Sequence, residues 1–74
     1  MKPYIRFDKI KIGKLYTAEY YDSERVIDTK IIFVTSKFSF EPKYNKVFGP
    51  PTIHGISNNK QIELEYFNYY FREL

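Results

Sequence analysis

Aromatic rings dominate the hydrophobic part of this chain. Seven Phe and eight Tyr occur among the 74 residues, whereas Trp is absent and Ala18 is the single alanine. Aromatic and β-branched residues favour strands, and alanine, the best helix former, is almost missing. The core must therefore be built from large rings, and this supply of side chains favours a β-rich fold.

The length leaves room for one domain over residues 1–74 and for little else. A chain this short needs dense packing, a covalent or metal staple, or a partner. There is no cysteine, and the lone His54 cannot supply the roughly four Cys or His ligands of a structural zinc site. We therefore expect packing and partners to stabilise the domain, with no metal and no cofactor.

The first half of the chain alternates in hydrophobicity as strands do. Residues 4–12 are predicted to form a strand, with Ile10 and Ile12 on one face and Phe7, Lys9 and Lys11 on the other. Gly13 interrupts this pattern, and a second strand is predicted over residues 14–21. Residues 22–25 are polar and predict a turn, after which β-branched and aromatic residues predict a strand from about Lys30 to Glu41.

The second half contains a long loop and a hairpin. Residues 42–52 hold three of the four prolines and a glycine, which predicts an excursion without regular structure. Residues 52–56 and 61–66 are predicted strands joined by a tight turn, because Asn58 and Asn59 tolerate positive φ. The period of Phe67, Tyr70, Phe71 and Leu74 predicts a short terminal helix with buried rings, and a strand through residues 69–71 is the alternative.

These elements predict a mainly β fold of about five strands. The arrangement is either a small curled antiparallel sheet or a partly open barrel of SH3-like or OB-like type, with the short C-terminal helix added. Closure or curling would protect strand edges that an apolar chain of this length could not otherwise cover.

The residues that could carry catalysis or bind ions and nucleotides do not form any known motif. His54 has no evident nucleophile or acid partner in the sequence, and there is no cysteine nucleophile. The acidic residues from Asp22 to Asp28 lack the glycine and glutamate that a calcium loop requires, and no glycine-rich phosphate loop is present. We therefore expect a protein that is not an enzyme.

Charge alternates along the chain and does not build one uniform basic surface, although the net charge is +3. A dedicated nucleic-acid-binding protein usually shows a stronger bias. Phe7, Lys9, Lys11 and Lys37 could nevertheless contact phosphates and stack on bases if the fold brings them together. Nucleic-acid binding is therefore the alternative function.

The interpretation we favour is stoichiometric binding to a larger protein. The long loop is the predicted contact, because its prolines restrict its conformations and its rings are flanked by lysines; the residues are Lys43, Tyr44, Lys46 and Phe48. The abundance of Lys, Ile, Tyr, Phe and Asn is what an AT-rich coding sequence would favour, and it suggests a phage or mobile-element modulator or inhibitor of a host protein. No apolar run reaches the roughly 18 residues of a membrane span, so a cytoplasmic location is expected; the oligomeric state stays open.

Overall fold

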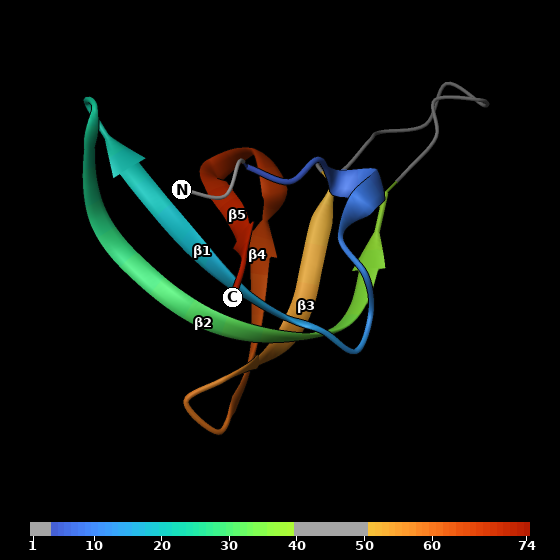
Figure 1. The fold of residues 1–74 in the computed structure, drawn as a ribbon. Helices are drawn as coiled ribbons and strands as arrows, with labels where there is room; N and C mark the ends of the chain where they lie inside the picture. The colour runs from blue at the N-terminus through green and yellow to red at the C-terminus, as the bar shows by residue number, and fades with distance from the viewer. Residues whose placement is uncertain (1–3, 40–50) are drawn as a thin grey trace.

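The computed structural model describes residues 4–39 and 51–74, and within them five antiparallel strands form one sheet (Figure 1). The strands have the order β4-β3-β2-β1-β5, so the fifth strand returns beside the first. The elements in chain order are η1 (Phe7–Lys9), β1 (Leu15–Asp22), β2 (Arg25–Phe38), β3 (Thr52–Ser57), β4 (Lys60–Glu65), η2 (Tyr66–Asn68) and β5 (Tyr69–Glu73), where η denotes a 3-10 helix. The predicted mainly β fold of five strands is confirmed, in its curled and unclosed form.

Two tight turns join the strands where the sequence predicted them. Ser23 and Glu24 between β1 and β2 both have positive φ, at 51° and 72°, and Asn58 and Asn59 between β3 and β4 have φ of 54° and 62°. Positive φ at two successive residues is the backbone of a two-residue hairpin turn, and its twist matches that of the flanking strands. These turns determine the register of the two hairpins.

The core lies on the concave face of the sheet. Alternate residues of the strands point inward, so that Ala18 of β1 lies opposite Phe71 of β5 and Ile53 of β3 lies opposite Leu64 of β4. The buried apolar residues are Ile10, Tyr16, Ala18, Ile32, Val34, Ile53, Leu64 and Phe71. At the bottom of this core the Tyr16 hydroxyl accepts a hydrogen bond from the backbone N–H of Lys11 at 2.8 Å, which satisfies a buried phenol.

The strand predicted over residues 4–12 is wrong. This segment crosses the concave face as an irregular cover with one 3-10 turn, and Figure 1 shows it passing over the open side of the curled sheet. A curled sheet needs a cover for its concave side, and the 3-10 turn directs Ile10 into the core while leaving Ile12 60% exposed. Ile10 and Ile12 therefore do not share a face, nor do Phe7, Lys9 and Lys11.

The short C-terminal helix is also wrong. Only the turn of η2 is helical, and residues 69–73 form β5, which pairs with β1 from Tyr16 to Tyr20. The edge of β1 offers a ladder of backbone hydrogen bonds that a helix of eight residues could not replace. The terminal rings are consequently only partly buried, because Phe71 is enclosed while Phe67 and Tyr70 are exposed.

No helix among the described residues is long and apolar enough to cross a membrane.

Candidate functional site

The residues predicted to contact a partner lie outside the part of the chain that the structure describes. They are Lys43, Tyr44, Lys46 and Phe48, all in the part of the sequence between β2 and β3. The contact through this loop therefore stays a prediction.

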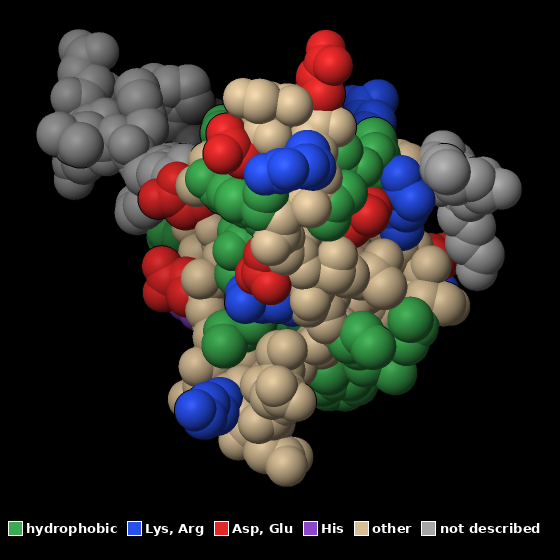
Figure 2. Space-filling view, turned by 90° about the vertical axis from the view of Figure 1, so that its left-hand side faces the viewer, with side chains coloured by type: hydrophobic (Ala, Val, Ile, Leu, Met, Phe, Trp, Pro, Cys, Tyr) green, Lys and Arg blue, Asp and Glu red, His purple; other side chains and the backbone are tan. Residues whose placement is uncertain are grey.

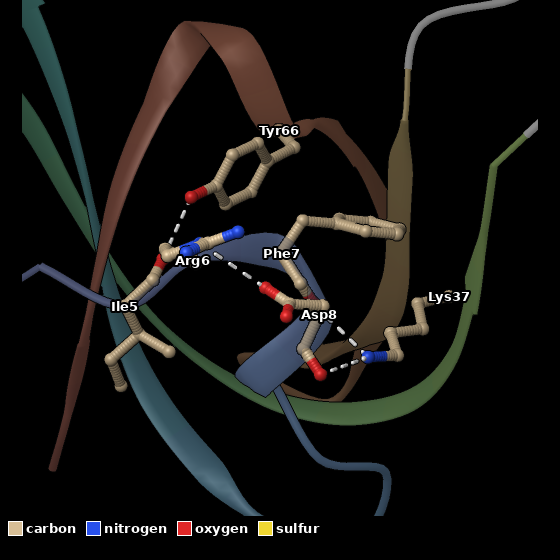
Figure 3. A network of polar contacts seen from close by, with 6 residues as sticks. All are labelled: Ile5, Arg6, Phe7, Asp8, Lys37 and Tyr66. Atoms are coloured by element: carbon tan, nitrogen blue, oxygen red, sulfur yellow. Dashed lines mark hydrogen bonds and ion pairs between the residues drawn. The ribbon is translucent and has the colours of Figure 1, made fainter.

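Two of the four residues predicted to bind nucleic acid are brought together. The ammonium of Lys37 lies 5.3 Å from the centre of the Phe7 ring and donates hydrogen bonds to the backbone carbonyls of Phe7 at 3.0 Å and Asp8 at 3.3 Å (Figure 3). Lys37 thus ties η1 to the far end of β2. Lys9 and Lys11 are exposed on the covering segment.

His54 lies on the outer face of β3, opposite Glu63 of β4. Its Nδ1 is 3.9 Å from a carboxylate oxygen of Glu63, and both side chains are well exposed. This is a surface ion pair when the imidazole is protonated, and such pairs contribute little to stability. The described residues contain no group of three or more His, Cys, Asp or Glu side chains that could bind a metal ion.

A row of apolar side chains crosses the outer face of the sheet. Leu15 of β1 lies opposite Phe33 of β2, which lies opposite Ile56 of β3, and each of the three is at least 40% exposed. Ile31 is exposed in the next row of β2, and Leu74 joins the row through a backbone hydrogen bond to Leu15. In Figure 2, exposed hydrophobic side chains gather at the lower right of the view, with most charged side chains above them.

A cluster of tyrosines occupies the same face on the β1–β5 side. Tyr70 lies between Tyr4 and Tyr21, with ring centres 4.5 Å and 4.9 Å away, and the hydroxyls of Tyr4 and Tyr21 are 3.0 Å apart. The hydrogen bond to Tyr4 is the main cause that raises the pKa of Tyr21, followed by partial desolvation and the nearby charge of Glu19. This cluster attaches the start of the described chain to the outside of the sheet.

An ion pair lies beneath these tyrosines. Arg72 Nε is 3.3 Å from a carboxylate oxygen of Glu19, and the Arg72 guanidinium stacks over the Tyr4 ring at 4.4 Å. Both paired atoms are shielded from solvent but are not aligned for a hydrogen bond, so their attraction is coulombic. Desolvation lowers the pKa of Arg72, but Tyr4 and the charge of Glu19 outweigh it and the net shift is upward.

A cleft opens where β2 and β3 diverge. The two strands pair only from Phe33 onward, and the earlier part of β2 swings away from the β3–β4 hairpin, as Figure 1 shows. The cleft has a volume of about 690 Å³ and is bounded by residues 28–31 of β2 on one side and by residues 56–60 of the hairpin on the other. Leu15 of the outer apolar row and Ile62 of β4 complete its lining.

Neither a family model nor a curated protein nor a solved structure matches this chain.

The outer apolar row and the cleft were missed by sequence reasoning. The signal lies in β2, where Ile31, Ile32, Phe33 and Val34 are consecutive apolar residues, so both faces of the strand carry apolar side chains. A strand with one solvated face alternates apolar and polar residues. The break in alternation indicates that the outer face of β2 carries apolar side chains, and Ile31 and Phe33 are both exposed there.

Proposed function

We propose that this protein acts in the cytoplasm by stoichiometric, non-enzymatic binding to a larger protein, and that the outer face of its sheet makes the contact. The observation that carries the proposal is the row of Leu15, Phe33 and Ile56 on three adjacent strands. Single exposed apolar residues are common, but a contiguous row across a sheet is typical of a protein-binding surface.

The size of the domain strengthens this argument. A chain of 74 residues has few large apolar side chains to spare from its core, yet Leu15, Ile31, Phe33 and Ile56 lie exposed on three neighbouring strands. The row also has a polar neighbour at its β4 end, since Gln61 lies opposite Ile56. An apolar centre with a polar rim is the usual anatomy of a protein interface.

Composition supports a particular kind of partner. The bias toward residues favoured by AT-rich coding sequences suggests a phage or mobile-element protein, and such small proteins can modulate or inhibit a host protein by occupying its surface. The contact predicted from the sequence through Lys43, Tyr44, Lys46 and Phe48 remains part of the proposal. The alternative, binding of nucleic acid, is favoured by the exposed Lys9 and Lys11.

The test compares two exposed phenylalanines. The purified protein captures its partner from host lysate, and the pair is then remade from purified components and titrated by calorimetry. We expect Phe33→Asp to weaken binding by more than tenfold, because a carboxylate would be buried without a partner at the centre of the interface. Phe67→Asp makes the same change at a residue that is 74% exposed on η2, outside the row, and should bind as the wild type does.

Equal affinity of the Phe33→Asp protein and the wild type for the captured partner would remove the outer face from the proposal. A nucleic-acid partner would instead give a salt-sensitive mobility shift that Lys9→Ala and Lys11→Ala reduce.

A further inference from the structure

The first part of β2 has an unpaired edge. β2 pairs with β1 from Arg25 to Phe33, but its pairing with β3 begins only at Phe33. Within residues 4–39 and 51–74, no strand pairs with residues 25–32 on that second side. An unpaired edge is a template for another strand, which is why proteins usually shorten, charge or cover such edges.

The backbone groups of this edge face the cleft. Val34 directs its own groups toward the β1 side, since its N–H donates to the carbonyl of Lys14 and its carbonyl accepts from the N–H of Gly13. In an antiparallel strand these directions alternate from residue to residue. The N–H and C=O groups of Thr29 and Ile31 therefore point away from β1 and into the cleft beside the β3–β4 turn.

The walls of the cleft differ in chemistry between its two faces. On the outer face the exposed Ile31 and Ile56 flank the opening. On the inner face Lys30 forms an ion pair with Asp28 at 2.8 Å, and this pair is the cause that raises the pKa of Lys30. Lys60, at the tip of the opposite wall, makes no ion pair with any described residue, so one positive charge remains at this end of the cleft.

We propose that the cleft binds an extended segment of a partner protein, which adds as a strand to the β2 edge at Thr29 and Ile31. Apolar side chains on alternate positions of the segment contact Ile31 and Ile56, and a carboxylate on the other face pairs with Lys60. This inference rests on the proposed function and specifies the recognition mode: backbone hydrogen bonds supply affinity and alternate side chains supply specificity.

A single strand fits this place better than a second copy of the protein. The β2 strand of a second copy would bring its own β1 alongside, and that strand would need the space in which the β3–β4 turn lies. The edge along β4 carries exposed Glu63 and Glu65, and edge charges of this kind discourage pairing. The β2 edge has no such charge on its outer face, where Thr29 and Ile31 lie.

The experiment uses the ¹⁵N-labelled full chain and an eight-residue probe peptide that alternates Val and Glu. We expect chemical-shift changes at residues 28–31 and 57–60, and slower hydrogen exchange of the Thr29 and Ile31 amides, at peptide concentrations up to about 1 mM. Lys60→Glu should weaken binding about fivefold, because it removes an exposed ion pair with a peptide glutamate and places two negative charges beside each other. Lys11→Glu makes the same charge change away from the cleft and should leave binding unchanged.

Three results would overturn the inference. The first is that the Val–Glu peptide produces no protection of the Thr29 and Ile31 amides. The second is that a peptide with proline at its central positions, which cannot pair as a strand, binds equally well. The third is that the same amides become protected when the chain associates with itself at high concentration. If Phe33→Asp abolishes capture of the partner while the peptide result is negative, the outer face binds without strand addition. If Phe33→Asp leaves capture of the partner unchanged and the peptide also gives no protection, the proposed function itself is wrong.

Discussion

The β1–β5 side of the sheet is covered, whereas the β2–β3 side is open. On the covered side, the backbone N–H of Ile5 donates to the carbonyl of Phe71 at 2.8 Å, and three tyrosines stack over the outside of the strands. On the open side, β2 separates from β3 before Phe33 and leaves both a bare edge and exposed apolar side chains.

The aromatic rings on the covered side pack against one another. Tyr66 and Phe71 stack with ring centres 5.8 Å apart and an angle of 11°, and Tyr66 meets the Phe7 ring edge-on at 5.5 Å. These contacts join the cover, η2 and β5 into one packed unit. Rings on the covered side therefore contribute to stability, whereas apolar residues on the open side remain exposed.

The largest expected effect is the removal of a ring on the covered side. Phe71 is fully buried opposite Ala18, so Phe71→Ala should lower the free energy of unfolding by about 3–5 kcal/mol, the range for a buried Phe replaced by Ala. This loss would consume most of the stability of a small domain. Urea denaturation followed by circular dichroism measures it.

Phe33→Ala is the matched control, because it removes the same side chain from the open side, where Phe33 is 40% exposed. Phe33→Ala should lower the free energy of unfolding by less than half as much as Phe71→Ala does. Equal losses from the two substitutions would show that the outer row is part of the stabilising core, and the contrast between the two sides would no longer hold.

Much of the β structure could be predicted because it depends on local signals. Two-residue turns need positive φ, which Asn58 and Asn59 accept readily, and the alternation of Ile62 and Leu64 with acidic residues marks a strand with one solvated face. Three of the hairpin strands were therefore located within a few residues of their observed bounds.

The cover and the last strand depended on contacts that are distant in sequence. Whether residues 69–73 form a helix or a strand is decided by the edge of β1, about fifty residues earlier in the chain. Ile10 and Ile12 alternate as a strand would, yet only Ile10 is needed to close the core. The outer apolar row depends on how adjacent strands align Leu15, Phe33 and Ile56, and no local pattern specifies that alignment.

A smaller effect is expected on the open side, where β2 and β3 diverge. Gly55 lies against β2 at the point of divergence, and a β-carbon there would overlap the carbonyl oxygen of Phe33 and approach Ile32 Cγ1 to 2.6 Å. Gly55→Ala should therefore force β3 away from β2 and destabilise the protein by about 1–3 kcal/mol, as overpacking does.

Gly13→Asn provides the comparison for that substitution in the same denaturation assay. Gly13 has φ of +86° with open space around the missing side chain, and Asn tolerates positive φ. We expect Gly13→Asn to lower the free energy of unfolding by much less than Gly55→Ala does. If Gly55→Ala is neutral, β2 and β3 are not tightly joined at this point and the cleft is not rigid.

The smallest effect concerns the hydrogen bond that fastens the cover. The Tyr66 hydroxyl donates to the backbone carbonyl of Ile5 at 2.7 Å, and Figure 3 shows the ring reaching over from η2 to the covering segment. Tyr66→Phe retains the ring contacts and leaves that carbonyl without this donor, so we expect a loss of about 1 kcal/mol at neutral pH. The same denaturation series measures it.

The pH dependence tests the cause of this loss. Burial is the main influence that raises the pKa of Tyr66 above its ordinary value of 10.0, so folding favours the neutral phenol. Its stabilising contribution is therefore complete below pH 10 and is lost as the pH rises through the folded-state pKa. As the pH rises above about 10 the wild type should lose stability, and Tyr66→Phe should lose less. Tyr21→Phe is the control, because the pKa of Tyr21 is also raised, chiefly by its hydrogen bond with Tyr4 on the exposed surface. If only Tyr21→Phe flattens the profile, the cover is fastened by the outer tyrosine cluster and not by Tyr66.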